Sequence, residues 1–366
     1  MSGVLEAVKS IFFGERLEPA DAVPRNILRQ LSSIPRLTGI LPYMGWIDDE
    51  RLLVLDQGAF GEKPSKALGF CIETMPQTGA NEEMERVLAS LFMSCPTGTG
   101  IQISLYGSPH ILPLLKRQAN MLPVDADKIN ADWGNKRNRN IYRVLARRRI
   151  DHYLKGTAYS LFSHQTYLLR DFRCVISVTL PLDPDNNSDR EEAIRVRESV
   201  HATLRSAHLP GTDWGPEDLL NFVGDFFDHD RVFGKGAEKP IEYDRSRPMR
   251  ASLSNLEIAS ATADSYIKFR KAGGAETALQ TFSVRQYPRY FRLGNMGAMI
   301  GDAFQMALSI PCPFMITIGA ISLDYESART KAQMKSARAT QAAGSQMARF
   351  QPDLQDRKRD WDMVLR

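Results

Sequence analysis

The sequence predicts an α+β protein: two mixed sheet-and-helix subdomains followed by a long C-terminal helical connector. Strand-like and helix-like segments alternate along 366 residues, a length that suits about two domains. Apolar residues make up 43% of the chain and charged residues 25%, which is typical of a soluble globular protein. We expect an N-terminal amphipathic arm at 1–30, subdomains at 31–185 and 186–323, and the connector at 324–366.

Residues 40–106 form the stretch around which the first subdomain is organised. Asn81 precedes two glutamates and a run of apolar residues with helical spacing, which predicts an N-capped helix. Ile101, Ile103 and Leu105 alternate with polar neighbours, which predicts a strand with one buried face. The expected elements are strands at 52–55 and 67–74, a helix over 84–92 and a strand over 101–105.

The remaining elements follow from apolar runs and from helix start signals. Ser188 and Glu191 have the spacing of a capping box, and Pro216 suits the first turn of a helix. The expected elements are helices at 112–117 and 136–157, a central strand at 172–180, helices at 190–208 and 216–227, an edge strand at 267–269, a strand at 281–293, a helix at 296–308, a central strand at 314–321 and a long helix after Asp324.

Positive charge gathers in one predicted helix, although the formal net charge of the whole chain is only +4. Its inward face would carry Ile141, Leu145, Ile150, Tyr153 and Leu154. The outward basic residues, our candidates for binding an anion or a partner, are Lys136, Arg137, Arg139, Arg143, Arg147, Arg148 and Arg149. Such a face can contact phosphates, anionic lipids or an acidic partner, or can simply be solvated. We find no aromatic stacking pattern for single-stranded nucleic acid.

Other site chemistries find little support. Asp225, Asp228, His229 and Asp230 lie close together, and either a cation site or capping at a helix end would use them. The four cysteines lack metal-ligand spacing, which indicates reduced thiols in a cytosolic protein. No GxSxG motif is present, so no serine hydrolase site is predicted. We expect no catalytic residue, no metal and no small-molecule substrate.

Membrane and export signals are also weak. The first residues contain Glu6 and lack a small-residue cleavage site, which argues against a signal peptide. The most hydrophobic region, 296–323, is interrupted by Asp302, Gln305 and two prolines. This pattern favours a buried helix and strand over a spanning helix.

Several strings occur in the order known from one family: LPY, GFCIETMPQTGANEEM, PTGTGIQISLYGSP and, at 168–181, LLRDFRCVISVTLP. They resemble the N-terminal region of TraC-like conjugative transfer ATPases of type IV secretion systems, the VirB/TraC type. The resemblance implies ATP hydrolysis that powers pilus assembly and substrate transfer, association into oligomers, and inner-membrane secretion proteins as partners. It also implies a cytoplasmic protein held peripherally at the inner membrane.

The chain departs from that family at the nucleotide site. The P-loop pattern GxxxxGK(S/T) is absent, and at the nearest approach, Gly234 to Gly236, Ala237 stands where a hydroxyl is required. We therefore expect the N-terminal part alone, inactive by itself, with ATP and Mg²⁺ implied only for a motor domain outside this chain. Alternatives are a free-standing nucleic-acid-binding protein that uses the basic helix 136–149, and an ATPase with an unconventional site.

Overall fold

The computed structural model describes residues 37–56, 66–77, 81–93, 95–120, 141–162, 167–228, 230–233, 240–253, 257–260, 266–270, 276–283, 310–344 and 358–359. The predicted N-terminal arm, the helix at 296–308 and most of the strand at 281–293 lie outside these residues. The fold is α+β, as predicted.

One antiparallel sheet forms the centre of the described part of the chain, with strand order β1-β2-β3-β5-β4-β10 and with β6 paired to β3. The strands are β1 (Tyr43–Ile47), β2 (Leu52–Asp56), β3 (Lys66–Thr74), β4 (Gly100–Ser108), β5 (Asp171–Leu180), β6 (Gly211–Asp213) and β10 (Phe314–Ile321). β5 pairs antiparallel with both β3 and β4, so these two run in the same direction with β5 between them. Gly69 is required in β3, because a Cβ there would lie 2.9 Å from the carbonyl oxygen of Val178.

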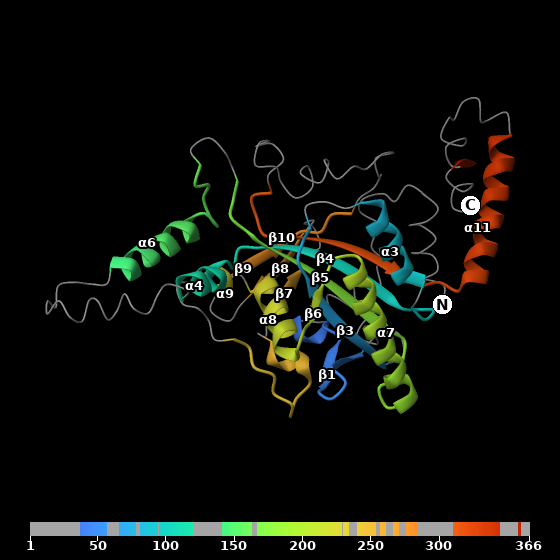
Figure 1. The fold of residues 1–366 in the computed structure, drawn as a ribbon, viewed down its shortest axis with the longest axis horizontal. Helices are drawn as coiled ribbons and strands as arrows, with labels where there is room; N and C mark the ends of the chain where they lie inside the picture. The colour runs from blue at the N-terminus through green and yellow to red at the C-terminus, as the bar shows by residue number, and fades with distance from the viewer. Residues whose placement is uncertain are drawn as a thin grey trace.

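Two helices cover one face of this sheet: α3 (Glu82–Met93) and α7 (Asn187–Ser206) (Figure 1). Leu68, Phe70 and Ile72 alternate along β3 and all join the core on this side. The predicted N-cap of α3 is confirmed, since Asn81 Oδ1 accepts a hydrogen bond from the Met84 N–H at 2.8 Å.

The opposite face is covered by α8 (Pro216–Phe227), by a 3₁₀ helix, η3 (Met249–Ser252), and by a second sheet. This sheet has the order β7 (Glu257–Ser260), β8 (Ile267–Arg270), β9 (Glu276–Leu279). Tyr106 is buried here, with its ring centroid 5.4 Å from that of Phe222. The prediction of only one buried face for β4 is therefore wrong, because a second layer covers the face that carries Tyr106.

Three further expectations need correction. β8 lies between β7 and β9 and is not an edge strand, while β10 pairs with β4 at one end of the described sheet and is not central. Ser188 does not cap α7: the side chain of Asn186 accepts from the Ser188 N–H at 3.0 Å. Asn186, two residues before Ser188, satisfies a free N–H group of the first turn. The capping-box spacing alone therefore did not locate the start of the helix.

The remaining described helices are the 3₁₀ helix η1 (Leu37–Gly39), α4 (Leu112–Asn120), α6 (Ile141–Lys155), α9 (Asp230–Phe233) and α11 (Tyr325–Ala343). α4 and α6 extend from one side of the sheet, and α11, the predicted long helix, stands at the opposite side (Figure 1). None of the described helices combines the length and apolarity needed to cross a membrane.

β6 and β10 come from residues 186–323, yet they join the sheet that holds the strands of residues 31–185. Strands from both proposed subdomains therefore share one sheet. The division of the chain into an arm, two subdomains and a connector stays a prediction.

Candidate docking surface and its polar anchors

α6 contains the predicted basic residues that the structure describes. Lys136, Arg137 and Arg139 lie outside the described residues, and Arg143 lies in the first turn of α6. Arg147, Arg148 and Arg149 follow in mid-helix, and all three side chains are exposed. Their role as contact residues stays a prediction.

The predicted inward face of α6 is only partly inward. Ile150 and Leu154 are half-buried, but Leu145 is 46% and Tyr153 is 40% exposed. The helix extends beyond the sheet and contacts α4 (Figure 1). Among its described side chains, from 145 to 155, those of Ala146, Ile150 and Leu154 are half-buried and the others are exposed. The sequence indicates a helix with an apolar and a basic face. It does not indicate which of the apolar side chains become buried.

The exposed apolar side chains continue beyond α6. Tyr159 is 76% exposed, and Phe162 and, in α4, Leu114 are exposed as well. We call α4, α6 and residues 156–162 together the basic projection. Its two helices carry seven basic residues, two in α4 and five in α6, against the single carboxylate of Asp151. Since the whole chain has a net charge of +4, the rest of the chain is net negative.

Backbone and side-chain hydrogen bonds tie the end of α6 to the start of β5. The Leu169 N–H donates to the Gly156 carbonyl at 2.8 Å. Arg170 Nη1 donates to the carbonyls of Thr157 at 2.7 Å and of Leu169 at 2.9 Å. Burial lowers the pKa of Arg170 from its ordinary value. The exposed projection therefore has a well-defined attachment at this end.

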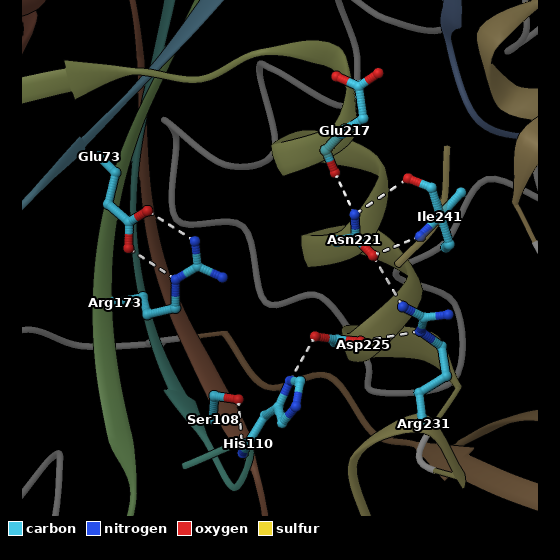
Figure 2. Close-up of polar contacts among 9 residues, drawn as sticks. All are labelled: Glu73, Ser108, His110, Arg173, Glu217, Asn221, Asp225, Arg231 and Ile241. Atoms are coloured by element: carbon cyan, nitrogen blue, oxygen red, sulfur yellow. Dashed lines mark hydrogen bonds and ion pairs between the residues drawn. The ribbon is translucent and has the colours of Figure 1, made fainter. Parts of the chain in front are cut away.

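The base of α4 is tied to α8 through a histidine–aspartate pair (Figure 2). Ser108 Oγ accepts from the His110 N–H at 3.1 Å, and His110 Nδ1 lies 2.9 Å from Asp225 Oδ2. Arg231 Nε donates to the other carboxylate oxygen at 2.9 Å. The side chains of Asp225 and Arg231 are only 11% and 8% exposed. Burial opposes ionisation of Asp225, but the hydrogen bonds from His110 and Arg231 outweigh it and lower its pKa.

Asn221 extends this network to the segment after α9. Its Oδ1 accepts from Arg231 Nη2 and from the Ile241 N–H, both at 2.9 Å. Its Nδ2 donates to the carbonyls of Glu217 at 2.7 Å and of Ile241 at 3.2 Å (Figure 2). One side chain thus joins three parts of the chain.

A second ion pair lies on the same face of the sheet. Arg173 Nε and Nη2 each donate to one carboxylate oxygen of Glu73 at 2.7 Å, and Trp214 Nε1 donates to Glu73 Oε2 at 2.8 Å. The Arg173 guanidinium also lies 5.3 Å from the Trp214 ring centroid. Burial opposes ionisation of Glu73, but its contacts with Arg173 and Trp214 lower its pKa. This arrangement joins β3, β5 and the short connection between β6 and α8, to which Trp214 belongs.

These polar groups support the fold and bind one another. Asp225 is engaged by His110 and Arg231, and the Asp228 N–H bonds the Gly224 carbonyl at the end of α8. His229 lies outside the described residues. Within the described ranges, no group of three His, Cys, Asp or Glu residues could hold a metal ion. Sequence reasoning singled out Asp225 for a cation site and missed His110, which lies 115 residues away from it.

The chain is similar in sequence to proteins of one known family. Residues 37–366 match the model of a family described as TraC protein. The chain is 21% identical over 372 residues to Protein TraC of Escherichia coli (strain K12), an alignment that covers 99% of this chain and 39% of that relative. The chain thus spans well under half of the relative's length. From the match over most of its length, and in agreement with the resemblance of its strings, the chain belongs to the TraC family of conjugative transfer proteins.

Proposed function

We propose that this chain is the N-terminal assembly and docking module of a type IV secretion ATPase, and that it contacts inner-membrane channel components during conjugative DNA transfer and pilus assembly. The basic projection carries this proposal. It exposes basic and apolar side chains on two helices, of which Arg170 ties one to the start of β5 and the His110–Asp225 pair ties the other to α8. An exposed patch of this kind, on a fixed base, is typical of a binding surface.

The chain is not expected to hydrolyse ATP alone, because its sequence lacks the glycine loop, lysine and hydroxyl that hold a nucleotide phosphate and Mg²⁺. In the proposed arrangement, ATP and Mg²⁺ bind a motor part of the whole protein. This module then holds that motor, and other subunits of a homo-oligomer, at the cytoplasmic face of the inner membrane.

A conjugation assay tests the proposal. We expect deletion of the gene to abolish transfer and the intact gene to restore it. The triple reversal Arg147→Glu, Arg148→Glu and Arg149→Glu should lower the number of transconjugants per donor roughly tenfold or more, because it replaces attraction by repulsion at the contact. The matched control is Arg329→Glu, Lys331→Glu and Arg338→Glu, which makes the same charge change at exposed positions of α11.

The control should transfer as well as the unaltered protein. Unchanged transfer after gene deletion would refute a role in conjugation. Normal transfer with the triple reversal, at equal protein level, would remove the basic projection from the docking surface.

The exposure of three consecutive arginines also favours the second candidate, a nucleic-acid-binding protein that uses the basic helix 136–149. This function predicts a DNA mobility shift at low salt that the triple reversal abolishes. Absence of a shift at low salt would eliminate it.

A further inference from the structure

The basic projection combines two kinds of exposed side chain that a protein surface seldom groups together. Arginine and lysine side chains of α4 and α6 stand beside exposed Leu114, Leu145, Tyr153, Tyr159 and Phe162. Large apolar residues cost free energy in water, so their grouping beside cations marks a surface with a partner that is both anionic and apolar.

The helical positions show how the two kinds mix on α6. At about 100° per residue, Ala146, Ile150 and Leu154 fall on one side, which is the half-buried one. Leu145, Arg148, Arg149, His152 and Lys155 fall on the exposed side. Tyr153 lies next to Arg149 at the edge of that side, so cationic and apolar groups point outward together.

We propose that the basic projection binds the anionic phospholipid surface of a membrane. This inference rests on the proposed docking function and identifies one partner of that surface. The arginines and lysines would contact lipid phosphates, each basic residue contributing about fivefold in affinity. The leucine and aromatic side chains would enter the boundary between headgroups and acyl chains, as in interfacial helices.

Charge and shape favour a lipid surface over the other anionic partners. Single-stranded nucleic acid is bound in positively charged grooves with stacked bases. The side chains of Arg147, Arg148 and Arg149 are instead exposed, on a helix that extends away from the sheet (Figure 1). The exposed aliphatic side chains of Leu114 and Leu145 have no partner on a phosphate backbone, but they do have one in lipid. The positive charge concentrated in α4 and α6, in a chain whose net charge is only +4, would favour an approach with the projection toward an anionic surface.

Vesicle co-sedimentation of the purified chain tests the inference. We expect binding to phosphatidylcholine vesicles that contain roughly 30% phosphatidylglycerol, and much weaker binding to pure phosphatidylcholine. The reversal of Arg147, Arg148 and Arg149 to Glu should weaken binding to the anionic vesicles about 100-fold or more. Raising the ionic strength from about 0.1 M to about 1 M should also weaken binding, because the screening length falls to about 3 Å.

A second variant tests the apolar part separately. Tyr159→Ser with Phe162→Ser keeps every charge and should still weaken binding severalfold, since less apolar surface enters the lipid boundary. The α11 triple reversal, at Arg329, Lys331 and Arg338, should bind as the unaltered chain does. Circular dichroism of each variant is the control for folding.

Equal binding to neutral and anionic vesicles, or equal binding by the Arg147–Arg149 reversal, would overturn the inference. So would binding to a single-stranded oligonucleotide without binding to anionic vesicles. The conjugation assay separates the two proposals: transfer that depends on the chain without vesicle binding would leave docking to proteins, and vesicle binding without an effect on transfer would refute the proposed function alone.

Discussion

Single residues on the α8 side of the sheet carry much of the attachment of the basic projection. Replacement of Asp225 by Ala removes the carboxylate that compensates the buried Arg231 guanidinium and that holds His110. We expect a loss of roughly 3 kcal/mol in the free energy of unfolding, measured by urea denaturation, because breaking a buried ion pair leaves a buried charge uncompensated.

The matched control is Asp49→Ala in an exposed turn, which should change stability by less than about 0.5 kcal/mol. The pKa of Asp225 is lowered in the fold, so its contribution is present above the ordinary carboxyl pKa and is lost as pH falls through the lowered value. The difference in unfolding free energy between Asp225→Ala and the unaltered chain should therefore disappear only in acid. A difference that stays constant in acid would contradict this account.

Asp171 should behave in the opposite way. Burial raises its pKa, with Glu73 adding to the rise and Arg173 and His110 opposing it. A raised pKa means that the folded state disfavours the carboxylate at neutral pH. Asp171→Asn should therefore raise the unfolding free energy by a few tenths of a kcal/mol at pH 7, with the gain vanishing as pH falls below the ordinary carboxyl value. A loss of stability at pH 7 would show that the ionised form is needed.

Sequence reasoning could identify the residue types of these networks but not their partners. Asp225 stood out because it lies near other aspartates and a histidine, and local spacing suggested capping or a cation. The partner that decides its role, His110, lies just after β4, 115 residues earlier in the sequence, and the packing of α8 on β4 brings the two together.

Two residues, Asn186 and Ser188, are candidates for the N-cap of α7, and substitutions distinguish them. Asn186→Ala should destabilise the protein by about 1 kcal/mol in urea denaturation, because it removes the acceptor for the Ser188 N–H. Ser188→Ala, which alters the residue that the sequence predicts as the cap, should cost less than about 0.5 kcal/mol. The reverse ranking would restore the capping box of Ser188 and Glu191.

The elements themselves were largely predictable from periodicity. The strands at 52–55, 67–74 and 172–180 and the helix at 216–227 appear where the apolar patterns place them. The position of β8 within its sheet was predicted wrongly, and β10, predicted as central, stands at one end of the described sheet. An apolar run of five to eight residues has the same composition in a central strand and at a sheet end, so only pairing distinguishes them.

At the scale of the whole molecule, the clearest expectation concerns nucleotide. A ligand at 100 times its Kd stabilises the folded state by about 2.7 kcal/mol, which raises the melting temperature measurably. We expect ATP with Mg²⁺ to leave the melting temperature of this chain unchanged, since it lacks a P-loop. A known P-loop ATPase serves as the positive control, and a concentration-dependent rise for this chain would support the alternative of an unconventional ATPase site.

The strand order of the larger sheet, and the layers on its two faces, also belong to the whole molecule. β5 is inserted between β3 and β4, and β6 and β10 join from much later in the sequence. Leu68, Phe70 and Ile72 face α7, while Ala67 and Cys71 face α8. Successive side chains of a strand point to opposite faces, so both layers were needed before either side of β3 could be assigned a partner.

By itself, the sequence determined the α+β class, most of the described helices and strands, the resemblance to TraC-like proteins and the concentration of basic residues in one helix. Those features depend on composition and on periodicity within a segment. Tertiary structure alone decided the strand order, the second layer over Tyr106, the His110–Asp225–Arg231 network and the exposure of Leu145 and Tyr153. Each of these depends on which distant segments pack together, and the pattern within one segment does not specify its partner.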